Sequence, residues 1–202
     1  MTKACTYYLA PPSPYVYLGH QRFAALAQQH AVDVDVRPFD LGRVFGISGG
    51  LPLAKRAPQR QAYRLVELER WSRFLGLPLN LHPAFFPVSG DAAARLIIAA
   101  KLAHGNDAAM LLTGAIGRAV WAEERNIADN DTLSAIAAAA GLDSATLMES
   151  AGSPAVQAEY DRYTDDAIAA NVFGAPWYII DGVGYWGQDR LDFVERAFQQ
   201  QV

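Results

Sequence analysis

A long helical stretch enclosed by strand-like ends is the feature that most constrains how this chain can fold. Helical periodicity runs almost unbroken from about residue 58 to residue 172, without a convincing strand. The strand-like segments outside it are residues 4–9, 32–36, 177–180 and 183–186. A helical stripe from Tyr15 to Ala27 joins the first two by a parallel crossover, and Asp181–Gly182 predicts a hairpin between the last two. With a final helix over about 189–199, the predicted order is βαβ, helical insertion, ββα.

Capping residues predict where the helices begin. Ser13 and Ser153 each precede a proline, the pattern of an N-cap followed by proline at the first helical position. Asp91 and Asp131 are predicted to cap two alanine-rich helices. The helix that follows Ser153 is predicted to carry Val172.

The charge balance and the hydropathy pattern exclude two classes of partner. The chain has 17 Lys and Arg against 21 Asp and Glu, a net charge of −4, so no nucleic-acid surface is expected. No apolar stretch reaches the roughly 18 residues that a membrane span needs. The first residues also lack the pattern of a signal peptide. We expect a soluble, cytoplasmic protein with no membrane partner.

Cysteine and histidine usage limits the chemistry. Cys5 is the only cysteine, so a dithiol oxidoreductase is excluded, and a buried position in the first strand is expected for it. No HxxxH, HExxH or Cys/His pairing is present, so no metal site is predicted. The histidines, which are His20, His30, His82 and His104, are expected at the solvated surface.

Three motifs together carry a family resemblance. They are SPYVYL at residues 13–18, VFGAP at residues 172–176 and WGQDRL at residues 186–191. In this order they resemble the 2-hydroxychromene-2-carboxylate isomerases, which belong with the kappa-class glutathione transferases and the DsbA-like oxidoreductases. The resemblance covers nearly the whole chain, and the C-terminal motif is its most specific part.

The resemblance implies a fold and a domain division. The fold is α/β and thioredoxin-like, of the DsbA and kappa-class type, with a large all-helical insertion. Residues 1–45 and 160–202 would form the thioredoxin-like domain, and residues 46–159 the helical insertion domain. The bond before Pro176 would be cis, as at the corresponding position of such folds.

Ser13 has two interpretations. Taken alone it is a helix cap, because Ser153 stands before a proline in the same way. The resemblance implies more: Ser13 replaces a nucleophilic cysteine and donates a hydrogen bond to the sulfur of glutathione. The positive end of the following helix would favour that sulfur as a thiolate.

The resemblance also implies a glutathione site with glutathione as cofactor. Its predicted residues are Ser13, Ala175, Pro176, Trp186, Gly187, Gln188 and Asp189. The backbone of Ala175 would pair with the peptide in strand-like fashion, and Asp189 would bind the γ-glutamyl ammonium. The alternatives are that Pro176 is simply the first residue of a strand and that Asp189 is a helix cap.

A substrate site is implied beside it. Val44, Phe45 and Phe85 would line an aromatic ring, although each is equally plausible as core. Lys55, Arg56 and Arg60 are candidates for the cation that meets a substrate carboxylate; the alternative is that they are solubilising surface residues.

The resemblance therefore implies a glutathione-dependent isomerase of an aromatic, carboxylate-bearing enone, acting by reversible thiolate addition. The resemblance also implies a homodimer. Two departures from the family pattern, Ala10 and Gly50, leave room for a noncatalytic thioredoxin-like binding module. A kappa-like glutathione transferase or peroxidase is the third hypothesis.

Overall fold

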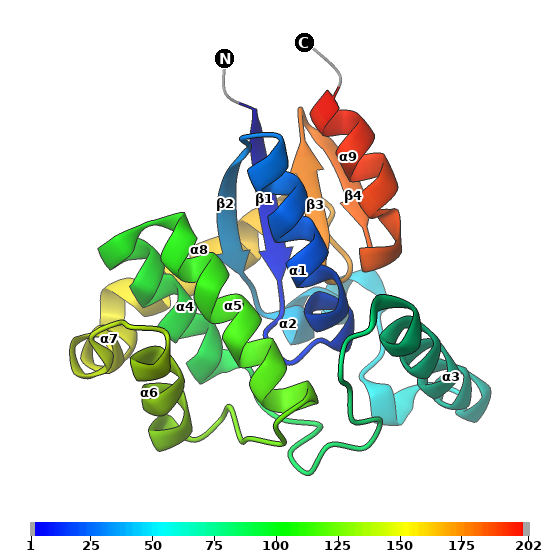
Figure 1. Cartoon of the computed structure of the whole chain (residues 1–202), viewed down its shortest axis with the longest axis horizontal. Coiled ribbons are helices and arrows are strands. Elements are labelled where there is room, and N and C mark those ends of the chain that lie inside the picture. The colour runs from blue at the N-terminus through cyan, green and yellow to red at the C-terminus, as the bar shows by residue number, and fades with distance from the viewer. Residues whose placement is uncertain (1–2, 200–202) are drawn as a thin grey trace.

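A four-stranded mixed sheet forms the centre of the molecule (Figure 1). The structure is a computed structural model that describes residues 3–199. The strands are β1 (Ala4–Leu9), β2 (Asp33–Pro38), β3 (Trp177–Ile180) and β4 (Val183–Trp186), in the order β2-β1-β3-β4. β1 pairs with β2 in parallel and with β3 antiparallel, and β3 pairs antiparallel with β4. The predicted strands, crossover and hairpin are therefore confirmed.

Alternation along β1 gives the sheet two buried faces. Tyr7 points to one side, where its ring stacks on Tyr178 at 5.3 Å and packs on Phe23 at 4.7 Å. Tyr8 points to the other side and meets Phe39 edge-on at 6.0 Å. Because both faces are apolar, helices must cover both.

Helices cover the two faces and extend beyond one edge (Figure 1). The α-helices are α1 (Pro14–Gln29), α2 (Leu41–Ser48), α3 (Pro58–Leu75), α4 (Asp91–His104), α5 (Asn106–Trp121), α6 (Asn130–Ala139), α7 (Ser144–Ala151), α8 (Pro154–Ala169) and α9 (Leu191–Gln199). Single 3-10 turns occupy η1 (Leu53–Lys55) and η2 (Gln188–Arg190). α1 and α9 lie on one face and α2 and α8 on the other, while α4 to α7 gather beyond β2 and α3 stands on the opposite side. This is the thioredoxin-like fold with a helical insertion that the sequence predicts.

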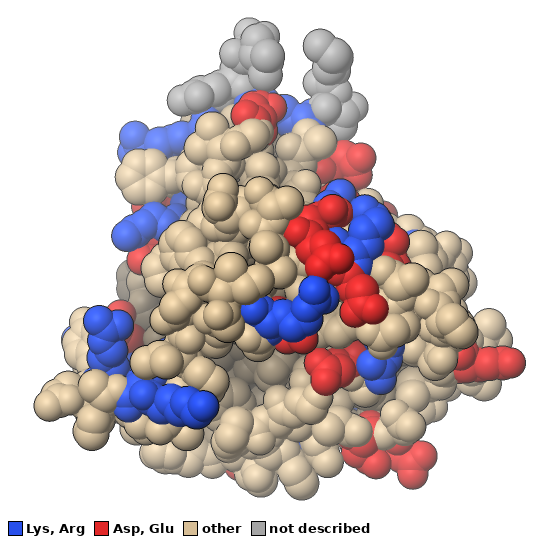
Figure 2. Space-filling model, turned by 180° about the vertical axis from the view of Figure 1, so that it is seen from behind, with Lys and Arg blue, Asp and Glu red and all other residues tan. Residues whose placement is uncertain are grey.

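Charged side chains gather over α8, on the face shown in Figure 2. Asp166 accepts hydrogen bonds from Arg37 of β2 at 2.9 Å and from Arg162 at 3.0 Å. Arg43 of α2 donates to Asp165 at 2.8 Å. These ion pairs tie α8 to β2 and α2, so the helix closes this face of the sheet.

The structure corrects several helix limits. Asp129, rather than Asp131, caps α6, because its carboxylate accepts from the Thr132 amide three positions later at 2.8 Å. Gly90 is the N-cap of α4, and Asp91 is its first residue. α8 ends at Ala169 and does not carry Val172. α2 was not predicted at all.

The predicted domain division stays a prediction. The boundary at residues 45 and 46 falls inside α2, and the boundary at 159 and 160 falls inside α8. One continuous apolar core joins β1 and α1 to the helices beyond the sheet edge.

Two buried titratable side chains lie in β1 and α1. Cys5 is buried as expected, and burial raises the pKa of its thiol above the ordinary range. His20 corrects the expected surface position: it is buried between the Tyr7 hydroxyl, 3.5 Å from its Nδ1, and Gly114 of α5. Burial lowers the pKa of His20 to about 4.

No helix within residues 3–199 is long and apolar enough to cross a membrane. Within the same residues, no group of three or more His, Cys, Asp and Glu side chains could hold a metal ion.

Candidate active site

Ser13 lies in the connection between β1 and α1, directly before the helix. Pro11 and Pro12 follow the strand, and the Ser13 amide donates to the Ala10 carbonyl at 2.9 Å. The Ser13 Oγ accepts a hydrogen bond from the Val16 amide at 3.3 Å, which confirms the predicted N-cap. Because Oγ accepts this bond, its own proton stays available to a ligand. The helix start therefore offers a hydroxyl donor beside a positive dipole end.

The loop that leads into β3, residues 173–176, is called the β3 entry loop and lies at the same cavity as Ser13. The Ala175–Pro176 peptide is cis, as predicted. The β1–β3 ladder ends at Tyr8 and Trp177, so Ala175 lies beyond its last pair. Trp186 covers the loop: a Cβ on Gly174 would stand 2.4 Å from the indole Nε1, which only glycine avoids. Ala175 thus forms a backbone edge with an aromatic wall.

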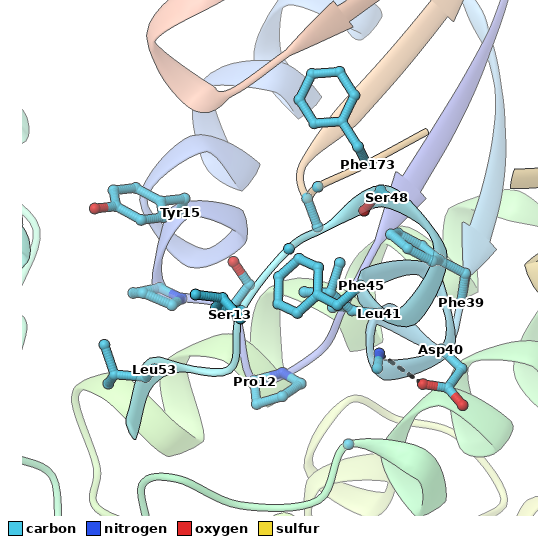
Figure 3. Close-up of a pocket in the computed structure, with 18 of the residues that line it drawn as sticks. Pro12, Ser13, Tyr15, Phe39, Asp40, Leu41, Phe45, Ser48, Leu53 and Phe173 are labelled. Atoms are coloured by element: carbon cyan, nitrogen blue, oxygen red, sulfur yellow. Dashed lines mark hydrogen bonds between the residues drawn. The ribbon is translucent and has the colours of Figure 1, made fainter. Parts of the chain in front are cut away.

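These elements enclose a cavity of about 750 Å³ (Figure 3). Ser13, Ala175 and Trp186 line it together with Phe45 and Phe86. In Figure 3 Ser13 lies between Tyr15 on one side and Phe45 on the other, with Phe173 above. A volume of this size accommodates a small peptide or an aromatic ligand, since ligand pockets usually measure about 300–1,000 Å³.

Acidic side chains in the cavity wall are already engaged. Asp40, the N-cap of α2, accepts from the amides of Gly42 and Arg43 at 2.8 and 3.1 Å (Figure 3). Asp91 accepts from the hydroxyls of Tyr160 and Ser89, both at 3.1 Å. Their negative charge is therefore partly compensated by local donors.

Three arginines also line the cavity. Arg56 donates from Nε to the Leu51 carbonyl at 2.8 Å, and its guanidinium lies 6.0 Å from the Phe45 ring centre. Arg60 is exposed at the start of α3. Arg64, one turn further, is only 8% exposed, and burial lowers its pKa below the ordinary arginine range. The cavity thus has an excess of positive charge on the α3 side.

Several residues predicted for the site do not line the cavity. Val44 is packed in the core behind the sheet because it sits on the inner face of α2, whereas its neighbour Phe45 points into the cavity. Lys55 is exposed outside it. Phe85 is 43% exposed, and the following residue, Phe86, lines the wall instead.

The predicted γ-glutamyl residues, Gln188 and Asp189, do not line the cavity. Gln188 is buried against Gly19 of α1, and its Oε1 accepts from Arg22 at 3.4 Å. Asp189 pairs with Arg190 at 3.1 Å. Gly187, not Asp189, precedes the η2 turn; its φ of 104° favours glycine. Pro176 and Gly187 are joined by a backbone hydrogen bond of 3.0 Å, which holds η2 beside the cis bond.

Arg64 is one of the cavity residues that sequence reasoning missed. A signal was present, because Arg64 precedes Leu68 by four positions and therefore shares its helix face. Leu68 is fully buried, so the same face of α3 turns Arg64 inward. Because most other positions of α3 are polar, the buried face formed by Arg64 and Leu68 is hard to recognise in the sequence.

The fold and the site define the class. With Ser13 at the start of α1 and the cis-proline loop at the same cavity, the chain is a thioredoxin-like protein of the DsbA type. The DSBA-like thioredoxin domain family matches residues 11–199.

Comparison with known proteins narrows the class. The chain is 32% identical over 196 residues to 2-hydroxychromene-2-carboxylate isomerase of Sphingobium xenophagum, covering 96% of this chain and 97% of that protein. It is 30% identical over 188 residues to the Pseudomonas putida protein of the same name, covering 92% and 89%. A solved structure of 2-hydroxychromene-2-carboxylate isomerase superposes with a TM-score of 0.81 at 26% identity, covering 97% of this chain and 94% of that one. The chain belongs to the 2-hydroxychromene-2-carboxylate isomerase family.

Proposed function

We propose that this protein is a glutathione-dependent isomerase of an aromatic, carboxylate-bearing enone. Family membership makes it an isomerase, and the names of its relatives indicate the substrate class. The observation that carries the dependence on glutathione is Ser13 at the helix start, in the same cavity as the Ala175 backbone, in a chain whose one cysteine is buried elsewhere.

The residues present fit glutathione. A tripeptide needs a backbone edge to pair with, and Ala175 lies beyond the last ladder pair of β3. A sulfur held as an anion needs donors, and Ser13 with the first amides of α1 supplies them. The absence of a side chain at Gly174 lets the Trp186 indole form a wall beside this edge.

The chemistry that glutathione supplies when bound is reversible addition of its sulfur to the conjugated double bond, which becomes a rotatable single bond before the thiol leaves. Ser13 would hold the sulfur by donating its hydroxyl proton. The Phe45 and Phe86 rings would position the aromatic part of the substrate and exclude water from it. Arginines on the α3 side would hold the carboxylate.

Further features of the proposal follow from the resemblance. Gln188 and Asp189 would bind the γ-glutamyl end, which requires that this end reach past Trp186 to η2. The homodimer and the cytoplasmic location also stay predictions.

Gly50 bears on the departure from the family pattern. A Cβ at this position would stand 2.2 Å from the Phe45 ring, so a larger residue requires that ring to move. The glycine therefore fits a cavity in which Phe45 forms the wall.

The decisive experiment is thiol counting during turnover. We expect benzylidenepyruvate isomers to equilibrate with glutathione at one-hundredth of the substrate concentration, while titrated free thiol stays constant. A transferase would consume one thiol per product. If the protein binds glutathione but turns over none of the aromatic enones tested, the noncatalytic binding module is favoured instead.

A further inference from the structure

Arg64 carries a buried charge that has no ion-pair partner among residues 3–199. Its Nη2 is covered and has no hydrogen-bond acceptor, and no carboxylate within residues 3–199 stands at ion-pair distance from it. Glu67, the nearest acid along α3, is engaged by Arg70. A buried guanidinium usually has a paired anion, because removing the charge from water is costly. Its environment is therefore incomplete without a ligand.

Aromatic rings hold the Arg64 guanidinium in place. Its central carbon lies 5.1 Å from the Phe86 ring centre and 5.6 Å from that of Trp121. The Trp121 indole Nε1 is a second buried donor without an acceptor. Both groups only donate hydrogen bonds, so an acceptor is what this part of the molecule lacks.

Arg64 lies in the wall between two cavities. One is the cavity at Ser13, and the other is a smaller one of about 300 Å³ that shares Leu53 and Phe86 with it. The other cations of the main cavity are less suited to recognition. Arg56 already donates to a carbonyl, and Arg60 is exposed to water, which weakens an ion pair.

We propose that Arg64 holds the carboxylate of the aromatic substrate and thereby restricts the cavity to anionic enones. The assignment rests on the proposed function, which supplies a carboxylate-bearing substrate. The guanidinium would provide charge-assisted donors, and Phe86, on which it packs, would contact the adjoining apolar part of the substrate. The same chemistry would recognise a glutathione carboxylate, so the test must separate the two sources.

Calorimetric titration with trans-cinnamate and with its uncharged analogue trans-cinnamamide isolates the charge. We expect Arg64→Met to weaken cinnamate binding at least tenfold while cinnamamide binding stays within twofold. Glutathione, titrated separately, should bind within twofold of wild type. Arg64→Lys keeps a charge but loses the planar donor set, so it should retain part of the preference for cinnamate.

Arg73→Met is the matched control, since it removes the same charge from the exposed face of the same helix, where Arg73 pairs with Glu69. It should change none of the three affinities by more than twofold. If Arg64→Met unfolds the protein, by its melting temperature and near-ultraviolet circular dichroism, Arg64→Lys decides alone through its cinnamate to cinnamamide ratio.

Three outcomes overturn the assignment: loss of glutathione rather than cinnamate affinity, no change in either, or loss of cinnamate preference in Arg60→Met instead. A distinct result separates this inference from the proposed function. If glutathione neither binds nor supports turnover, yet cinnamate is still selected through Arg64, the glutathione proposal fails and the carboxylate site stands.

Discussion

Two serines in this chain have the same local structure but different surroundings. Ser13 and Ser153 each precede a proline, cap a helix and accept from the amide three residues later at 3.3 Å. Only Ser13 borders the cavity. The pair therefore separates the capping role from the proposed chemical role.

We expect Ser13→Ala to cost about 1 kcal/mol of stability as a lost cap, and to lower glutathione-dependent turnover at least about tenfold by removing the donor to the sulfur. Ser153→Ala should cost a similar stability and leave turnover unchanged. Denaturant unfolding and kcat at saturating glutathione measure the two effects. Equal turnover in the two variants would remove Ser13 from the mechanism.

The roles of single residues were harder to predict from the sequence than the strands and helices. The repeated Ser–Pro pattern was enough to place both caps, because capping depends on neighbours in sequence. The role of Arg64 could not be predicted, because it depends on contacts of its guanidinium with Phe86 and Trp121, which are far away along the chain. Val44 and Phe45 are adjacent, and only the rotation of α2 decides which one lines the cavity.

At the scale of elements, the β3 entry loop and β4 act as one wall. The Phe173 ring packs edge-on against Trp177 at 4.7 Å and against Trp186 at 4.8 Å. Gly174 lies beneath the Trp186 indole without room for a Cβ. The position of this wall therefore depends on the absence of a side chain at Gly174.

We expect Gly174→Ala to displace Trp186 and to raise KM for glutathione severalfold while the fold is kept. Gly46 in α2 provides the control, because a Cβ there meets nothing within 4 Å. Gly46→Ala should leave KM unchanged and, at a helical position, favour the helix. An unaltered KM in Gly174→Ala would show that the Trp186 wall is not part of the glutathione site.

Strands were easier to predict than helix limits. Alternating residues and the Asp181–Gly182 turn place the sheet, because both signals are local. Asp129 and Asp131 are equally good caps by type, and only the chain path around Thr132 selects Asp129. α2 is short and Gly-containing, so its propensity is weak and its packing on α8 decides its formation.

At the scale of the whole molecule, His20 joins the thioredoxin-like part to the helices beyond β2. It lies in α1, faces Tyr7 of β1 and packs against Gly114 of α5. Its pKa in the folded protein, about 4, is below the ordinary value of 6.5. His20 therefore binds a proton less readily in the folded state than in the unfolded chain.

This linkage predicts an acid-sensitive fold. Stability from neutral His20 is complete above about pH 6.5 and is lost progressively as the pH falls toward 4, because the unfolded state binds the proton first. Between pH 7 and pH 5 the loss from this residue is about 2 kcal/mol. Urea unfolding at the two pH values should show a smaller loss for His20→Gln. His104→Gln, at an exposed histidine of α4, should follow wild type; a loss in His20→Gln as large as in wild type would place the acid sensitivity elsewhere.

The burial of Cys5 determines how this protein should respond to reagents that modify thiols. A thiol that is enclosed in the sheet and held protonated by its surroundings is a poor target for alkylating agents and mild oxidants. Native protein should therefore pass through iodoacetamide treatment unlabelled. If glutathione is the cofactor as proposed, inactivation by such a reagent during an assay would report on the small-molecule thiol in solution and not on alkylation of Cys5.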